Sequence, residues 1–273
     1  MWQIITDTVK SPKHSENQDA VSCFQSANNE NIIVAVADGH GSKKCFRSQT
    51  GSRFAVETLV AIFRQLFIKK EFDNWQVSIK DCEQNLAKNI HRHWLDKVEK
   101  HLAKNPFSED ELNIDKAVND YPVLSYGTTL LGAVITPHAI LYIQLGDGDI
   151  LTVQDNTVYR PLPKDEKLIA NETYSLSSKT AFNYFNFLYQ PVVNGFPDLI
   201  FLATDGYANS YKDETDFQKV AMDYCSIYKD DGADYIKQNI NAWLKDTTEN
   251  GSGDDITCAM IFKTNQHESV ITD

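Results

Sequence analysis

Acidic residues follow short apolar runs at four separated places in this chain of 273 residues. The four clusters are Asn17-Gln18-Asp19, Asp38-Gly39-His40-Gly41, Asp205-Gly206 and Asp254-Asp255. Carboxylates held at the ends of strands can converge in space although they are far apart along the chain. A convergent set of carboxylate oxygens is what hard divalent cations such as Mg²⁺ and Mn²⁺ require. The sequence therefore predicts a metal-dependent enzyme whose site is assembled from most of the length of one domain.

Glycine follows the acid at Asp38, Asp147 and Asp205, where it permits a tight turn and a close approach of the backbone to a ligand. A single Asp-Gly pair is more often an ordinary turn, but repeated pairs placed against apolar runs favour a binding site. His40 lies between two glycines, where it could bind a metal or transfer a proton, although a lone histidine is more often structural. No HExxH motif indicates a zinc site, so the sequence favours a hard cation.

The elements that must position these residues follow from the spacing of the apolar residues. Residues 32–37 form a continuous apolar run, which is typical of a strand buried on both faces. After this run, apolar residues recur at every third or fourth position, which predicts helices. Strands are expected over residues 1–9, 20–26, 32–37, 126–135, 139–145, 150–153, 157–159, 199–203 and 256–262, with a hairpin turn at Asp155-Asn156, and helices over residues 48–70, 75–102, 213–228 and 232–247.

For the remaining segments the sequence predicts a role in packing and not in chemistry. We expect residues 161–195 to form an irregular, flap-like insertion whose aromatic residues serve packing more than recognition. The apolar stripe of the helix over 75–102 predicts its buried face, whereas His91, His93 and His101 spread around that helix and are expected to be solvated. The strands form antiparallel-looking groups without a linker between them, so we predict one α+β domain over residues 1–263 and a polar tail over 264–273.

Charge and cysteine content narrow the class of protein. The formal net charge of −12 argues against nucleic acid and anionic membranes as partners, because both are polyanions. The five cysteines are scattered and lack CxxC spacing, which favours reduced thiols over disulfides or a zinc site. The N-terminus shows no signal-peptide pattern, and no apolar run reaches the length of a membrane span. We therefore expect a cytoplasmic protein that acts as a monomer.

Six motifs occur in the order Asn17-Gln18-Asp19-Ala20, Val36-Ala37-Asp38-Gly39-His40-Gly41, Tyr126-Gly127-Thr128-Thr129-Leu130, Leu145-Gly146-Asp147-Gly148, Leu202-Ala203-Thr204-Asp205-Gly206 and Gly253-Asp254-Asp255-Ile256-Thr257. Together they resemble the metal-dependent protein phosphatases of type 2C, the PPM family, in its compact bacterial-type branch. Each motif alone is weak, but the set covers nearly the whole chain. The resemblance implies a four-layer αββα sandwich, in which two central antiparallel β-sheets are flanked by pairs of helices.

The resemblance also implies a centre of two Mn²⁺ or Mg²⁺ ions at one edge of the sandwich. Asp38 would bridge the two cations, and the carbonyl oxygen of Gly39 would bind one of them. Asp205 and Asp254 would hold the other cation. These roles come from the positions that match the family's motifs and not from the spacing of the acids.

The catalytic roles that the resemblance implies fall on two residues. Asp19 would order a water held by the metals, and His40 would be the general acid that protonates the leaving serine or threonine oxygen. Water would attack in line, without a phosphoenzyme. Asp147 would help Asp205 to hold a third, weaker cation, but Asn209 stands where the family has the next carboxylate of that site.

Two positions depart from the family's pattern. His14, preceded by Lys13, stands where the family usually has Arg, so His14 and Lys13 are the candidate ligands of the substrate phosphate, although neither offers the bidentate fork of Arg. Gln18 stands where the family usually has Glu, so it keeps an oxygen donor for a metal but loses a charge. We predict a serine/threonine phosphatase that acts on a phosphorylated protein and opposes a kinase. A degenerate domain that binds phosphoproteins, and a hydrolase of small phosphoesters, stay open as alternatives.

Overall fold

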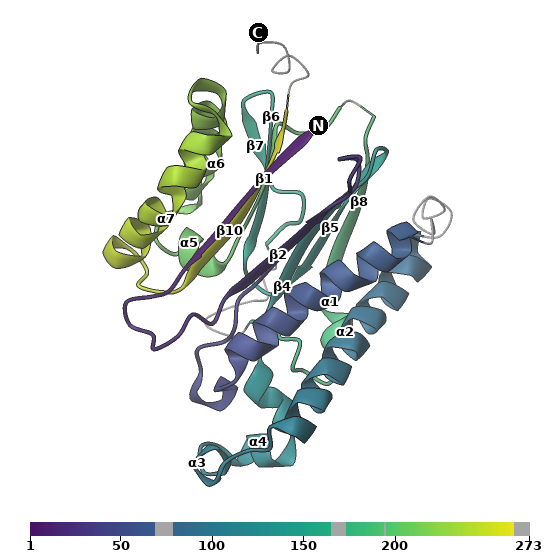
Figure 1. Cartoon of the computed structure of the whole chain (residues 1–273), viewed down its shortest axis with the longest axis vertical. Coiled ribbons are helices and arrows are strands. Elements are labelled where there is room, and N and C mark those ends of the chain that lie inside the picture. The colour runs from purple at the N-terminus through teal and green to yellow at the C-terminus, as the bar shows by residue number, and fades with distance from the viewer. Residues whose placement is uncertain (69–78, 165–172, 194, 265–273) are drawn as a thin grey trace.

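The computed structural model describes residues 1–68, 79–164, 173–193 and 195–264. Two five-stranded antiparallel sheets pack face to face in these residues (Figure 1). One sheet has the strand order β1-β10-β9-β6-β7, and the other has the order β2-β3-β4-β5-β8. The strands are β1 (Trp2–Val9), β2 (Ala20–Gln25), β3 (Ile32–Ala37), β4 (Leu130–Ile135), β5 (Ala139–Leu145), β6 (Asp149–Gln154), β7 (Thr157–Tyr159), β8 (Asn186–Pro191), β9 (Leu199–Ala203) and β10 (Ile256–Lys263).

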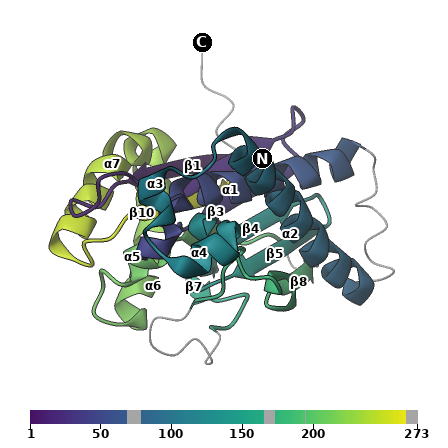
Figure 2. The same cartoon turned by 90° about the horizontal axis from the view of Figure 1, so that it is seen from below.

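A pair of long helices covers the outer face of each sheet (Figures 1 and 2). Helices α1 and α2 pack on the sheet that contains β3, and helices α6 and α7 pack on the sheet that contains β10. The helices are α1 (Ser48–Ile68), α2 (Ile79–Lys104), α3 (Glu109–Leu112), α4 (Lys116–Asp120), α5 (Asp205–Ala208), α6 (Glu214–Asp230) and α7 (Gly232–Asn250). The expected αββα sandwich is therefore confirmed.

The apolar run of β3 is buried on both faces, as its composition predicts. Ile33 and Ala35 pack into the layer between this sheet and α1 and α2. Ile32 and Val34 pack into the layer between the two sheets. Because neighbouring side chains of a strand point to opposite faces, a strand inside a four-layer sandwich needs apolar residues at every position.

Strand register brings the acidic clusters to one edge of the sandwich. In one sheet the last residue of β3, Ala37, pairs with the first residue of β2, Ala20. In the other sheet the last residue of β9, Ala203, pairs with Cys258 near the start of β10. The Oγ1 atom of Thr204 donates a hydrogen bond to Oδ2 of Asp19 (2.8 Å), which joins the two sheets at this edge. The loops that carry the clusters therefore leave the sheets side by side.

Two of the predictions about the strands are wrong. The strand expected over 126–135 begins only at Leu130, because Pro122–Tyr126 form a 3₁₀ helix that starts with the proline. The irregular segment expected over 161–195 contains a regular strand, β8, which pairs with β5. The aromatic residues of β8 pack against the core under α1 and α2, as expected.

The other elements agree with expectation within a few residues. Asp155 and Asn156 both have left-handed backbone angles (φ 51° and 57°), as a two-residue hairpin turn requires. Residues 75–78 at the start of the second expected helix lie outside the described residues, as does the polar tail after Thr264. The single domain over residues 1–263 stays a prediction. Cys23, Cys45, Cys225 and Cys258 are free thiols. Among the described helices, none combines the length and apolar character needed to cross a membrane.

The expectation for the three histidines of α2 is wrong for His91. Its side chain is buried, with 4% of the residue exposed, and its ring lies 5.8 Å from that of Phe182. His101 also has a protein partner, because its Nδ1 lies 2.7 Å from the hydroxyl of Tyr126. His93 is exposed, as predicted. Helix α2 is covered on more than one side because the segment before β8 folds against it, and this tertiary contact leaves no trace in the helical spacing.

Candidate metal centre

Asp38 directly follows β3, and the next strand fixes its backbone. The Asp38 N–H donates to Oγ1 of Thr129 (3.0 Å), and the Asp38 carbonyl accepts from the Thr129 N–H and from Oγ1 of Thr128, both at 2.8 Å. The His40 N–H donates to the carbonyl of Gly127 (3.0 Å). The Gly127-Thr128-Thr129 motif therefore holds the Asp38-to-His40 turn against the start of β4.

Gly39 lies where two other segments approach the backbone most closely. A Cβ atom at this position would lie 2.4 Å from the carbonyl oxygen of Gln18 and 2.9 Å from that of Ser48. Any side chain here would therefore push the β1–β2 loop or the start of α1 away. The glycine lets the three segments meet beside Asp38.

Asp205 is the first residue of α5, directly beyond β9 and Thr204. Its carboxyl group lies within hydrogen-bond reach of that of Asp38. Partial burial raises the pKa of Asp205 to about 6, with further upward effects from the charges of Asp147 and Asp254. Desolvation raises the pKa of Asp38 well above its ordinary value, and the charges of Asp19, Asp205 and Asp254 raise it further. The four predicted metal-binding aspartates, Asp38, Asp147, Asp205 and Asp254, therefore act on one another electrostatically.

Asp19 lies on the sheet side of this cluster and is nearly buried, with 9% exposed. Burial raises its pKa well above the ordinary value, although hydrogen bonds from Thr204 and Thr257 act in the opposite direction. The two threonines come from the ends of β9 and β10, so Asp19 is oriented by the opposite sheet. Its carboxylate is held in place whether or not a ligand is bound.

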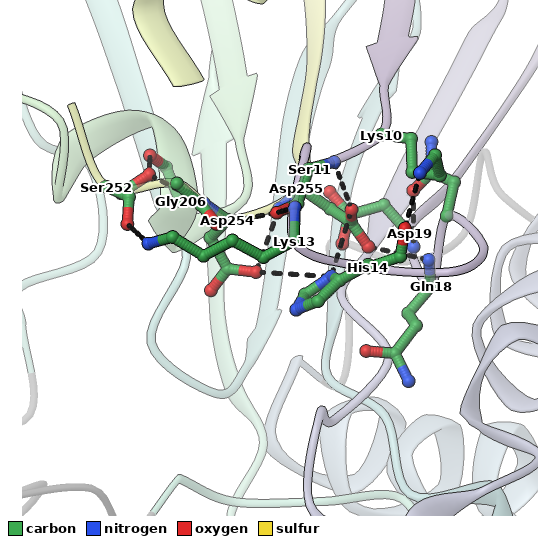
Figure 3. Close-up of polar contacts among 12 residues, drawn as sticks. Lys10, Ser11, Lys13, His14, Gln18, Asp19, Gly206, Ser252, Asp254 and Asp255 are labelled. Atoms are coloured by element: carbon green, nitrogen blue, oxygen red, sulfur yellow. Dashed lines mark hydrogen bonds and ion pairs between the residues drawn. The ribbon is translucent and has the colours of Figure 1, made fainter. Parts of the chain in front are cut away.

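Asp255 holds the whole β1–β2 loop (Figure 3). Its Oδ1 accepts from the N–H of Ser11 (2.6 Å) and its Oδ2 accepts from the N–H of Gln18 (2.7 Å). The side chain is almost fully buried, whereas that of the neighbouring Asp254 is about half exposed (51%). One acid of the Asp-Asp pair therefore fixes the loop, and the other faces the cluster and solvent.

The two predicted phosphate ligands lie beside Asp254 but contact other protein groups (Figure 3). Nδ1 of His14 lies 3.2 Å from Oδ1 of Asp255 and 3.9 Å from Oδ1 of Asp254. Nζ of Lys13 donates to the carbonyl of Ser252 (3.3 Å). The Lys13 side chain crosses Gly253 so closely that a Cβ there would lie 2.2 Å from Nζ.

Gln18 lies at the same edge but points away from Asp255 (Figure 3). Its Nε2 donates to Oγ of Ser48 (2.8 Å), and its backbone carbonyl accepts from Oγ of Ser52 (2.6 Å). The side-chain oxygen is therefore the donor atom that remains for a cation or for water. The structure brings Gln18 next to Gly39, but it does not direct the amide at Asp205 or Asp254.

His40 has one ring nitrogen without a protein partner. Its Nε2 is buried and makes no hydrogen bond among the described residues. Burial lowers the pKa of His40, while the charge of Asp147 raises it and that of Lys44 lowers it. The neutral imidazole is therefore favoured, and the charges of both Asp147 and Lys44 act on the pKa of His40.

The donors around this cluster fit a hard divalent cation. No group of three or more His, Cys, Asp or Glu side chains already surrounds a common point within the described part of the chain. The converging side chains nevertheless offer oxygen donors only, and Asp38 and Asp205 lie close enough to share a proton. A cation in place of that proton would offset the burial and the mutual repulsion that raise both pKa values. The chemistry of the donor set therefore agrees with Mn²⁺ or Mg²⁺.

A sequence profile described as protein phosphatase 2C matches residues 10–245, which include every acidic cluster except the last. The chain belongs to the protein phosphatase 2C family. No curated protein sequence matches the chain.

Solved structures of protein phosphatase 2C-like fold agree with this assignment. A bacterial serine phosphatase is 15% identical with a TM-score of 0.64, and the match covers 97% of this chain and 100% of that one. The serine/threonine phosphatase of S. agalactiae is 16% identical with a TM-score of 0.59, covering 97% and 100%. The Mycobacterium tuberculosis phosphatase PstP, whose catalytic domain was solved in complex with two manganese ions, is 12% identical with a TM-score of 0.57, covering 97% and 99%. At this identity the likeness shows the shared fold.

Some residues that build this protein phosphatase 2C site were assigned no role from the sequence. Asp255 and Thr204 organise the edge, and their only signal was their position in motifs beside Asp254 and Asp205. Lys43 and Lys44 are exposed directly after the His40 turn, and the charge of Lys44 acts on His40. A basic pair next to an acidic cluster was a signal that could have been used.

Proposed function

We propose that this chain is a serine/threonine phosphoprotein phosphatase that hydrolyses phosphomonoesters with water and two divalent cations, Mn²⁺ or Mg²⁺. The observation that carries the proposal is the set of aspartates at one sandwich edge, where burial and the charges of neighbouring acids raise the pKa values of Asp38 and Asp205. Membership of the protein phosphatase 2C family supports it. The two manganese ions in the PstP catalytic domain support the choice and number of cations.

The metal-binding roles fall on groups that the structure brings together. Asp38 and the Gly39 carbonyl would hold one cation, and Asp38, Asp205 and Asp254 the other. The charge of Asp147 acts on Asp205, and Asp147 would help Asp205 to hold a weaker third cation. When bound, the cations would neutralise the phosphoryl oxygens and lower the pKa of the attacking water toward neutrality.

Asp19 and His40 carry the proton chemistry in this proposal. Asp19 is oriented by the hydroxyls of Thr204 and Thr257, so its carboxylate can align the attacking water from a fixed position. His40 would protonate the leaving serine or threonine oxygen through Nε2, the ring nitrogen without a protein partner. Its lowered pKa leaves a minority of the imidazolium form at neutral pH, and Asp147 partly restores it.

Positive groups near the cluster would bind the substrate phosphate. Lys13 can leave its Ser252 carbonyl, because the contact is long (3.3 Å) and exposed. His14 contacts two aspartates, so it can bind phosphate only by turning away from Asp255. Lys13 is therefore the stronger candidate of the two. Its long side chain could reach over Asp254 towards a phosphoryl group.

A second function is favoured by one observation. Both residues that depart from the family's pattern serve structural contacts, because His14 lies against Asp255 and the Gln18 amide is bound to Ser48. A chain that has given up these two ligands could bind a phosphoprotein or a regulator without turning it over. The alternative function is therefore that of a degenerate domain that binds phosphoproteins.

Hydrolysis of p-nitrophenyl phosphate and of a phosphothreonine peptide separates the readings. With Mn²⁺ we expect turnover of both substrates, loss of turnover in EDTA, and loss of turnover in Asp38→Asn. No turnover despite bound metal would favour the degenerate domain. Turnover of the small ester alone would indicate a hydrolase of small phosphoesters, and turnover that survives both controls would refute the metal mechanism.

A further inference from the structure

A second concave site is lined by residues of α6 and α7 and of the segment that begins with α5. These helices belong to the layer that covers the β10 sheet (Figure 1). The site is an open pocket of about 430 Å³. Tyr207 of α5, Tyr211 just beyond it, Tyr224 of α6 and Trp243 of α7 line one part of it. The candidate metal centre does not use this pocket, although Asp205 and Tyr207 belong to the same four-residue helix.

The wall of the pocket is aromatic, and two of its hydroxyl groups bond to each other. The hydroxyls of Tyr207 and Tyr224 lie 2.7 Å apart, so one donates to the other, and both residues are buried. The rings of Tyr224 and Trp243 have centroids 6.2 Å apart, and those of Tyr207 and Tyr211 are 6.0 Å apart. Tyr211 and Trp243 are only partly buried. Aromatic surface therefore remains open to a ligand at the mouth of the pocket.

The rim of the pocket is acidic. Asp216 and Asp223 lie two turns apart on the same face of α6, and both line the pocket together with Lys219 between them. Asp216 is already paired with Lys219 of the same helix (2.7 Å). Asp223 is exposed and forms no ion pair within the described part of the chain. The Asp223 carboxylate therefore has no direct ion pair among the described residues, although the charge of Lys219 acts on it at longer range.

We propose that this pocket binds an arginine side chain presented by a partner protein. A guanidinium group is planar and weakly hydrated, so it can stack on Tyr211 or Trp243 while its N–H fork bonds to the Asp223 carboxylate. An acidic ligand would be repelled by the two aspartates, and a neutral apolar ligand would leave Asp223 without a partner. An arginine meets both the aromatic wall and the acidic rim.

The partner would dock next to the candidate metal centre. Asn209, one turn beyond Asp205, donates to Oδ2 of Asp205 (3.0 Å), and Oγ of Ser210 donates to the Gly206 carbonyl (2.8 Å). The segment that carries Tyr207 and Tyr211 is thus tied to Asp205. Binding itself is the readout, because arginine recognition here does not depend on whether the chain hydrolyses phosphate.

The test uses the full chain, labelled with ¹⁵N, and a capped Gly-Arg-Gly peptide. The same peptide with citrulline keeps the shape of arginine and removes its charge. Mg²⁺ is kept in the buffer so that the carboxylates of the metal centre do not attract the peptide. We expect saturable shifts of amide signals confined to α5, α6 and α7 with the arginine peptide, and none with the citrulline peptide.

Two variants and a control locate the contact. Asp223→Asn should weaken binding about tenfold, because it removes a charge-assisted hydrogen bond. Trp243→Leu should weaken binding by removing the stacking surface. Asp230→Asn, an exposed acid of the same helix outside the pocket, should leave affinity unchanged. Equal binding of the citrulline peptide, shifts elsewhere on the protein, or an Asp223→Asn affinity within twofold of the parent would overturn the proposal.

Discussion

Asp147 and Asp149 lie only two residues apart along the chain, but they belong to two groups of acids with different surroundings. Asp149 is paired with basic residues, whereas Asp147 belongs to a cluster of acids that act on one another. Asp149, the first residue of β6, is almost fully buried, but Arg160 (2.6 Å) and Lys164 (3.4 Å) supply cations to it. The same two bases also pair with Glu214 at the start of α6. Asp149 therefore belongs to a network whose charges the chain itself balances.

The cluster that includes Asp147 has no such balance. Asp38 and Asp205 are surrounded by other acids, and no lysine or arginine forms an ion pair with either of them in the described ranges. Clustered acids without protein cations are costly to fold unless a cation arrives from solvent. The difference between the two regions supports a structural role for Asp149 and the proposed metal-binding role for Asp38 and Asp205.

The largest expected effect comes from Asp38→Asn. If the cluster exists to hold cations, this change should lower phosphatase turnover by at least about 10³-fold, because the bridging carboxylate is lost. In EDTA the variant should melt at a higher temperature than the parent, since one of several repelling acids is removed. Mn²⁺ should raise the melting temperature of the parent far more than that of the variant.

Turnover and melting curves of the parent, Asp38→Asn and Asp230→Asn measure both effects. Asp230→Asn is the control, because this exposed acid lies outside both regions. An Asp38→Asn protein that is less stable than the parent in EDTA would show that Asp38 is a structural acid like Asp149.

Asp149→Asn should act in the opposite direction. It leaves Arg160 and Lys164 beside a buried neutral group, and breaking a buried ion pair from one side costs about 3 kcal/mol. We expect the free energy of unfolding from denaturant titration to fall by about this amount, with or without metal. Turnover of the folded fraction should remain. A loss smaller than that of Asp230→Asn would contradict the comparison.

The sequence predicts much of the fold and less of this contrast. The apolar runs of β3 and β9 and the glycines behind them are sufficient to place Asp38 and Asp205 at strand ends. Nothing in the order Asp147-Gly148-Asp149 tells the two acids apart, because the partners of Asp149 are brought to it by packing of the segment after β7 and of α6.

The same limit explains the other differences. The segment that contains β8 is rich in Asn, Ser and aromatic residues, which predicts an irregular segment. The strand forms because β5 pairs with it, and β5 lies about 45 residues earlier in the chain. The role of Asp255 depends on Ser11 and Gln18, more than 230 residues away. Sequence patterns predict where the elements and the acidic residues lie along the chain. The contacts between residues distant in sequence can be identified only from the folded structure.

Asp205 and Glu214 should contribute to stability with opposite pH dependence, although burial raises the pKa of Asp149 despite its basic partners. In metal-free protein the pKa of Asp205 is raised to about 6, first by burial and then by Asp147. The folded form holds this proton more tightly than the unfolded chain. Its stabilising contribution is therefore full below about pH 3.8 and lost as pH rises through about 6. Asp19 and Asp38 act in the same direction.

Glu214 behaves inversely. Burial alone would raise its pKa, but Arg160 and Lys164 lower it to about 2. Its contribution is therefore present above about pH 4.5 and lost as pH falls through about 2. Unfolding titrations in EDTA should show stability falling between pH 4 and 7 in the parent and a flatter curve in Asp205→Asn, while Glu214→Gln should change only the acid limb. Stability that rises over this range in EDTA, unaltered by Asp205→Asn, would refute the assignment.

The smallest expected effect tests whether Gln18 belongs to the acidic cluster around Asp38 and Asp205. Gln18→Glu adds a carboxylate next to Gly39, close to Asp38, which has no lysine or arginine ion pair among the described residues. We expect Mn²⁺ to bind about fivefold more tightly, because ligand charge tunes affinity for hard cations, and the metal-free protein to unfold more easily.

Ser48→Ala is the matched control, since it breaks the Gln18–Ser48 hydrogen bond without adding charge. Calorimetric titration with Mn²⁺ and unfolding in EDTA measure the two expected changes in the same samples. If Gln18→Glu tightens metal binding and Ser48→Ala does not, the added charge is responsible and Gln18 lies within reach of a cation. If both variants leave the Mn²⁺ affinity unchanged, Gln18 is a loop residue held by Ser48, and it does not belong to the metal-binding cluster around Asp38 and Asp205.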